Sequence, residues 1–187
     1  MQEHSQLELL VAAGATPSGP FGALVHTPCG DVQVDVLEVT DAEIADLPDD
    51  PTDRLHVQSH AWAAFTASGL VLSVDGLDPL TVRVSEPGPL IAMKLQSIMN
   101  RGAAKEGTDL LDIIRLTLDR ACGPVSRDQL EAADPQLRAD ALLHARRWFD
   151  LSAGRSLNKI RAVPEGSEIE LDDVRLVGEL LVAALES

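Results

Sequence analysis

The hydrophobic period of the chain changes near residue 86, and this change constrains the fold more than any other sequence feature. Over residues 32–39 apolar residues alternate with polar ones, which is the pattern of a half-buried strand. After Pro87-Gly88-Pro89 apolar residues recur with helical spacing. We therefore expect an α+β protein, with a mixed-sheet region over residues 1–86 and a helical domain over residues 87–187.

The first half contains signals for strands joined by tight turns. Pro28-Cys29-Gly30 predicts the turn of a hairpin, and Asp75-Gly76-Leu77-Asp78-Pro79 predicts a second turn. Residues 40–53 are acidic and contain two prolines, so we expect a surface loop with one short helical turn there. The strands are expected at residues 21–27, 32–39, 70–74 and 80–84.

The second half contains signals for helices. A broad apolar face runs from Leu90 to Met99 and is ended by Gly102. Thr108 can cap a second helix, which Gly123-Pro124 would stop, and Ser126 can cap a third. Further helices are expected at residues 137–149 and 172–185.

Composition places the chain among globular proteins. Its 187 residues are 45% hydrophobic and 24% charged, as in soluble domains. No segment supplies the roughly 18 consecutive apolar residues of a membrane span. The first residues contain acidic side chains and no Lys or Arg, unlike a secretory signal. We expect a cytoplasmic protein without a membrane partner.

The charge is strongly negative overall but uneven along the chain. A formal charge of -15 would repel nucleic acid if it were spread uniformly. Between residues 138 and 161, however, basic residues outnumber acidic ones. This excess is either a binding site for a polyanion or a helix whose basic side chains face water. On composition alone, the solvent-facing helix is the favoured interpretation. The basic residues are Arg138, Arg146, Arg147, Arg155, Lys159 and Arg161.

Asp35 is the first candidate for chemistry. Alternation places it on one strand face with Asp31 and Gln33. It is either a solvated carboxylate or a ligand that binds a hard cation together with other carboxylates. For Asp35 considered alone, the interpretation as a solvated carboxylate is favoured.

Lys94, Asp109 and Asp112 are the next candidates. Lys94 lies in a helix that is otherwise apolar on almost every side, so its ammonium must reach water, pair with an anion or neutralise a phosphate. Asp109 and Asp112 are three residues apart and can share a helix face. They either complement the helix dipole or pair with Lys94 beside a bound nucleotide.

Several other site classes find no support. The sequence contains no zinc-protease helix, phosphate-binding glycine loop or dinucleotide fingerprint. Aromatic residues make up 3% of the chain and Tyr is absent, which disfavours a base-stacking platform.

The segment from Glu86 to Leu116 resembles the AbiEii family of nucleotidyltransferase-like toxins, including the mycobacterial MenT group. Lys94-Leu95 matches the family's Lys-Leu pair, Arg101 its following Arg, and Asp109 with Asp112 its paired carboxylates. Ser97 stands where Ala is usual, and Thr108 where a basic residue is usual. The strand from Val32 to Val36 is similar to the one that carries the third acidic residue of these folds, which would be Asp35.

The resemblance implies a partial DNA polymerase β-like core followed by a helical domain. It implies a toxin of a toxin–antitoxin system, a transferase that adds nucleotides from a nucleoside triphosphate to the 3′ end of tRNA and so inhibits translation. Magnesium and a cognate antitoxin are the expected cofactor and partner.

The same resemblance suggests a role for each matched residue. Lys94 would contact the triphosphate with Arg101, and Asp109 would orient that lysine or bind metal with Asp35, supported by Asp112. The basic residues between 138 and 161 would hold the tRNA.

One family motif is missing from the sequence. Members carry a Gly-rich turn followed by Thr-x-Asp, and no such segment precedes Asp35. Because two-metal phosphoryl transfer needs several converging carboxylates, we expect this chain to be inactive or very weak as written. The alternative is a non-catalytic interaction module that retains the fold.

Overall fold

The computed structural model describes residues 5–73, 75–100 and 103–187. It shows an α+β chain in which small antiparallel sheets precede a mostly helical region. The chain divides into two compact units, Met1–Ala42 and Glu43–Ser187. No helix within the described residues is both long enough and apolar enough to cross a membrane.

The first unit holds a short helix and a three-stranded sheet. Helix α1 (Gln6–Ala12) begins with a capping box between Ser5 and Glu8. The sheet has the antiparallel order β1 (Thr16–Pro17), β2 (Gly22–Thr27) and β3 (Gly30–Asp35). The expected hairpin between β2 and β3 is confirmed, although β3 ends at Asp35 and not at the predicted Val39. Gly30 ends its turn at a φ of 123°, which favours glycine.

The loop expected over residues 40–53 is shorter than predicted, because a long helix begins inside it. A short helix, α2 (Asp41–Ala45), is followed by α3 (Pro51–Thr66). The Asp50 carboxylate accepts hydrogen bonds from the first turn of α3, and Pro51 follows it, a standard start signal. The spacing of apolar residues does not predict α3. Ser59 is buried along with the apolar residues of this helix, so the buried positions do not form a continuous apolar face in the sequence.

A two-stranded hairpin follows α3. Strands β4 (Ser68–Leu72) and β5 (Leu80–Val84) pair antiparallel, with Leu70 opposite Val82 and Leu72 opposite Leu80. Both strands were expected, although Val74, the predicted end of the first, lies outside the described residues. Pairing places the larger apolar side chains on one face of the hairpin, and this face is largely exposed: Leu70, Leu72, Leu80, Val82 and Val84.

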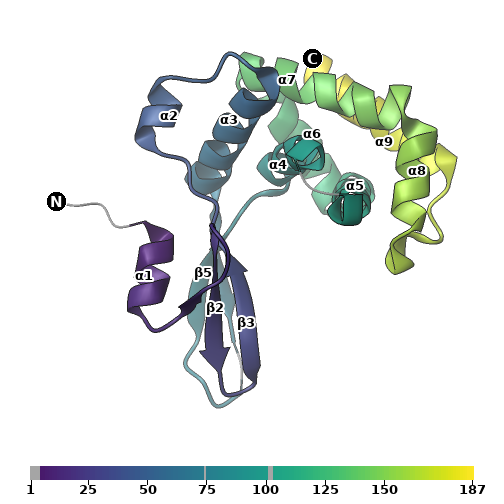
Figure 1. Ribbon diagram of the computed structural model, residues 1–187. Coiled ribbons are helices and arrows are strands. Elements are labelled where there is room, and N and C mark those ends of the chain that lie inside the picture. Colours follow the sequence, from purple (N-terminus) through teal and green to yellow (C-terminus); the bar gives the residue numbers. More distant parts are fainter. Residues whose placement is uncertain (1–4, 74, 101–102) are drawn as a thin grey trace. The chain divides into compact units, whose positions relative to one another are not determined.

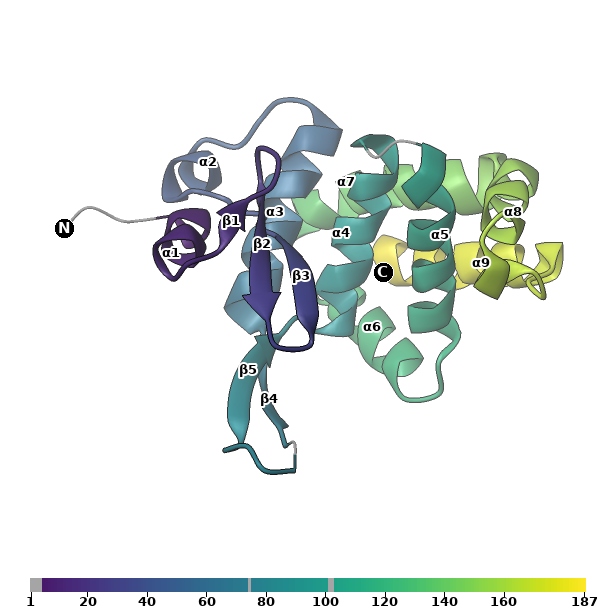
Figure 2. The ribbon, with the colours of Figure 1, turned by 60° about the horizontal axis from the view of Figure 1, so that its bottom comes forward.

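The remaining helices build the core. Helix α4 packs against α3, α5, α6 and α7, and Figure 2 shows it beside α5. Ile91, Ala92 and Leu95 of α4 are fully buried in the central hydrophobic cluster. The elements are α4 (Pro87–Asn100), α5 (Ala103–Leu118), α6 (Cys122–Glu131), α7 (Pro135–Ala145), a π-helical segment η1 (Arg146–Leu151), α8 (Ala153–Arg161), a 3-10 turn η2 (Pro164–Gly166) and α9 (Leu171–Glu186) (Figure 1).

Two predicted helix caps were wrong. Thr108 lies inside α5, and Ser126 lies inside α6, where its hydroxyl donates to the Gly123 carbonyl at 2.9 Å. Gly123-Pro124 do not stop a helix but stand in the first turn of α6. A proline is tolerated there because the N–H groups of a first turn have no partner within the helix.

The domain boundary expected at residues 86 and 87 falls inside the second unit. There α3, which precedes the hairpin, packs against α4, which follows it. The change of period therefore marks the end of a hairpin that connects two packed helices.

Gly107 and Gly154 provide a matched test of this helix packing. A Cβ on Gly107 would lie 2.3 Å from the Lys159 carbonyl of α8, whereas a Cβ on Gly154 meets nothing within 4 Å. We expect Gly107→Ala to destabilise the fold by about 1–3 kcal/mol through overpacking. Gly154→Ala should be neutral or stabilise it by up to about 1 kcal/mol. Urea unfolding of both variants measures the difference, and equal stabilities would contradict the close contact between α5 and α8.

Candidate functional site

The structure brings Lys94 of α4 together with Asp109 and Asp112 of α5. The Lys94 ammonium donates to Asp109 Oδ1 at 3.1 Å and to Asp112 Oδ2 at 2.7 Å. The side chains of Lys94, Asp109 and Asp112 are 20%, 3% and 32% exposed. One carboxylate is thus nearly enclosed, while the ammonium and the other carboxylate reach the surface.

Ser97 is a fourth member of this cluster, which the sequence did not single out for a role. Its hydroxyl lies 3.1 Å from Asp109 Oδ2 and 3.1 Å from the Lys94 carbonyl oxygen. Ser97 thereby contacts the Asp109 carboxylate oxygen that Lys94 does not. Its position next to Lys94 on α4 was the available signal, because residues three apart lie on one helix face.

Helix packing positions all of these side chains. Lys94 and Ser97 are one turn apart on α4, Asp109 and Asp112 are one turn apart on α5, and the two helices pack together. Neighbouring apolar residues, including Leu95, Ile98 and Leu110, are buried with at most 1% of their surface exposed. A cation on this apolar face needs an anion beside it, and α5 supplies two.

The charges of the cluster do not cancel. One ammonium faces two carboxylates, so the cluster has one negative charge in excess. The ammonium has three N–H donors, and the Asp109 and Asp112 carboxylates take two of them. The third can serve an anionic group that approaches from the exposed side.

The described residues do not fit a magnesium site. Among them no group of three or more His, Cys, Asp or Glu side chains is arranged to hold a metal ion. Both Asp109 oxygens already take part in contacts with Lys94 and Ser97. Asp35 lies on β3 of the first unit, where its carboxylate accepts a hydrogen bond from Gln33 at 3.1 Å. Arg101, expected to contact nucleotide, lies outside the described residues.

Most of the basic residues between 138 and 161 are held by the chain itself. Arg138 donates to the Leu185 carbonyl at the end of α9, and Arg161 donates to the Ile169 carbonyl at 2.9 Å. Arg146 pairs with Glu186, and Lys159 pairs with Glu106. Arg147 and Arg155 are exposed, as are Arg146 and Arg161. The Arg147 guanidinium lies 5.5 Å from the centre of the Trp148 ring.

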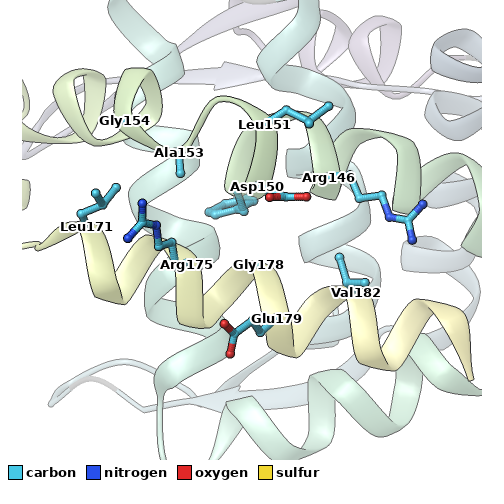
Figure 3. A pocket seen from close by; sticks show the side chains of 11 residues that line it. Arg146, Asp150, Leu151, Ala153, Gly154, Leu171, Arg175, Gly178, Glu179 and Val182 are labelled. Atoms are coloured by element: carbon cyan, nitrogen blue, oxygen red, sulfur yellow. The ribbon is translucent and has the colours of Figure 1, made fainter.

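A hollow of about 950 Å³ lies beside this basic segment, between η1, the start of α8 and α9 (Figure 3). Arg146 and Arg175 line it together with Asp150 and Glu179, over a floor that includes Phe149. The opposite charges balance, so the hollow offers no concentrated positive surface to a polyanion.

An ion pair that the sequence analysis missed joins α3 to α7. The Arg54 guanidinium donates to both Asp140 oxygens, at 2.7 and 2.8 Å, and to the carbonyls of Pro48 and Asp49. The Asp140 contact raises the pKa of Arg54. No sequence signal links residues 86 positions apart, so only the fold reveals this pair.

No family model, no curated protein and no solved structure matches this chain. The arrangement of the side chains is therefore the basis for an inference about function.

Removing the lysine of the cluster tests its contribution to stability. Lys94→Met leaves two carboxylates, one of them buried, without their cation. Since breaking a buried ion pair is costly, we expect a loss of about 3 kcal/mol. Urea unfolding measures it, with the exposed Lys105 changed to Met as the matched control. Equal stabilities of the two variants would show that the cluster contributes nothing to the fold.

His144 is a buried titratable group outside the cluster. It is 5% exposed, and in the described part of the chain neither ring nitrogen has a hydrogen-bond partner. Burial, together with the positive charge of Arg147, lowers the pKa of His144, and Asp140 and Asp50 oppose this shift. The neutral ring is therefore the form that the fold accommodates.

This lowered pKa predicts a loss of stability in acid. As the pH falls below about 6.5, the unfolded chain takes up the proton before the folded one, so the free energy of unfolding decreases. We expect His144→Leu to flatten the fall in stability between pH 7 and pH 5. At pH 7.5 it should cost little, because it removes a buried group without partners. Urea unfolding across this pH range measures both, and an unchanged slope would contradict the assignment.

Proposed function

We propose that this chain belongs to a nucleotidyltransferase toxin of a toxin–antitoxin system. Such a toxin transfers nucleotides from a nucleoside triphosphate to the 3′ end of tRNA and blocks translation in the cytoplasm. The observation that carries the proposal is the pairing of Lys94 with Asp109 and Asp112 across α4 and α5. These residues also carry the resemblance to the AbiEii and MenT toxins and their partial DNA polymerase β-like fold.

The physical support is that Lys94 is held in one place. A lysine side chain normally loses much rotamer freedom when it binds a ligand. Here two carboxylates already fix the ammonium while 20% of the side chain stays exposed. A point charge held in this way suits contact with a phosphate oxygen, and Ser97 and Asp109 act as its positioning residues.

The described residues supply only part of such a site. The excess negative charge of the cluster opposes a triphosphate, and the described residues hold no magnesium group. The role that these residues support is binding and orientation of the nucleotide. Among the six basic residues between 138 and 161, the exposed Arg147 and Arg155 are the first candidates for contact with tRNA.

A second function is favoured by the hairpin β4–β5. Its exposed face carries Leu70, Leu72, Leu80 and Val84, which are 49%, 44%, 60% and 45% exposed. Contiguous exposed apolar surface typically marks a contact with another protein. In this alternative, the chain is a non-catalytic interaction module, and the lysine cluster only joins α4 to α5.

Incubation with tRNA, magnesium and each labelled nucleoside triphosphate tests the proposal. We expect extension of the tRNA 3′ end to fall by at least 100-fold in Lys94→Ala, because the held ammonium is the phosphate contact. Asp109→Ala should cause a similar loss by releasing Lys94. Lys105→Ala, which removes an exposed lysine of α5, serves as the matched control.

Calorimetric titration of the same proteins with nucleoside triphosphate and magnesium separates the two functions. Binding that depends on Lys94 but not on Lys105 would support the nucleotide site. Absence of both binding and transfer in the unmodified chain would overturn the transferase proposal and favour the interaction module. Transfer that persists in Lys94→Ala would overturn the residue roles.

A further inference from the structure

A second hollow, of about 380 Å³, lies within the helical unit and away from the lysine cluster. Its walls come from the segment before α3, from one side of α3 and from the turn between α6 and α7. Volumes of this size are typical of small-molecule sites.

Apolar side chains form most of this hollow. Val57 and Leu137 are 3% and 2% exposed and provide a fixed floor, whereas Ile44 and Leu47 are 45% and 37% exposed at its edge. Trp62 adds an aromatic ring. A ligand with an apolar body would bury the exposed parts of Ile44 and Leu47, and this burial would favour its binding.

The hollow contains polar groups that can accept hydrogen bonds from a ligand. Gln58 lines it, and the Gln58 side-chain oxygen is buried without a hydrogen-bond partner in the described part of the chain. The carboxylate of Asp134 accepts the N–H groups of Gln136 and Leu137 through Oδ1, at 2.8 and 3.2 Å. No such bond is found for its Oδ2 among the described residues, and none of the described lining residues is Lys, Arg or His.

We propose that this hollow binds a small apolar amine in its protonated form. The ammonium meets the Asp134 carboxylate, and the Trp62 ring that lines the same hollow adds attraction for a cation. The N–H groups of the ammonium donate to the Gln58 side-chain oxygen. The Gln58 amide can turn toward the ligand, because its terminal side-chain torsion has a broad range of accessible angles. The apolar body lies against Val57 and Leu137. An anionic ligand of the same shape would be repelled by the Asp134 carboxylate.

Three probes with one ring and different charges test this assignment: 2-phenylethylamine, 2-phenylethanol and 3-phenylpropanoate. The chain has two tryptophans, so its indole N–H signals in an NMR titration distinguish Trp62 from the buried Trp148. We expect the amine to shift the Trp62 signal and not that of Trp148, with a Kd on the order of 1 mM. The alcohol should bind more weakly, and the carboxylate at least fivefold more weakly than the amine.

Asp50 supplies a matched control for Asp134. Each caps a helix with Oδ1, is followed by Pro, and accepts the N–H groups of the second and third helical residues. Asn caps as well as Asp, so Asp134→Asn and Asp50→Asn each remove one charge and keep the helix. We expect only Asp134→Asn to weaken the amine, by about threefold to fivefold. Gln58→Leu should weaken amine and alcohol alike.

The remaining outcomes each decide against the proposal. Equal affinity for the three probes would make the hollow a simple apolar cavity. No shift of Trp62 with the amine at 20 times the expected Kd would mean that the hollow takes no such ligand. An equal effect of Asp50→Asn and Asp134→Asn would place the attraction in the overall charge of -15 and not in this site.

Discussion

The structure depends on burying α4, a helix that is apolar on almost every side. Such a helix is stable only when other helices surround it, and α3, α5, α6 and α7 do so. Ile91, Leu95 and Ile98 are exposed by no more than 1%. A charged residue on α4 must therefore find its counter-charge on a neighbouring helix, because water does not reach most of its surface.

This constraint produces the lysine cluster. Lys94 is paired because α5 presents Asp109 and Asp112 one turn apart at the place where α4 passes. Ser97 adds a contact with Asp109 Oδ2, the carboxylate oxygen to which Lys94 does not donate. The result is a cation held between two carboxylates, and its ion pairs join α4 to α5.

Sequence patterns predicted some parts of the fold and missed others for identifiable reasons. The hairpin of β2 and β3 and the helices α4 and α9 carry strong periodicity with turn or cap residues at their ends, and each was expected at nearly its observed position. Helix α3 was missed because Ser59 lies among its buried residues. The caps predicted at Thr108 and Ser126 were wrong. A residue can cap a helix only at the position where the helix begins, and packing starts α5 and α6 several residues before Thr108 and Ser126.

The sequence by itself determined that strands precede helices, that α4 is buried and that Lys94 needs an anion, because these follow from the spacing of apolar residues and the cost of burying a charge. The sequence offered Asp109 and Asp112 as partners of Lys94 only as one of two alternatives, and the tertiary structure decided in favour of the pairing. Tertiary structure alone decided that Ser97 joins them, that Arg54 pairs with Asp140, and that most basic residues of the 138–161 segment bond within the chain. Contacts between residues far apart in sequence arise from the docking of whole helices, and no local pattern encodes that geometry.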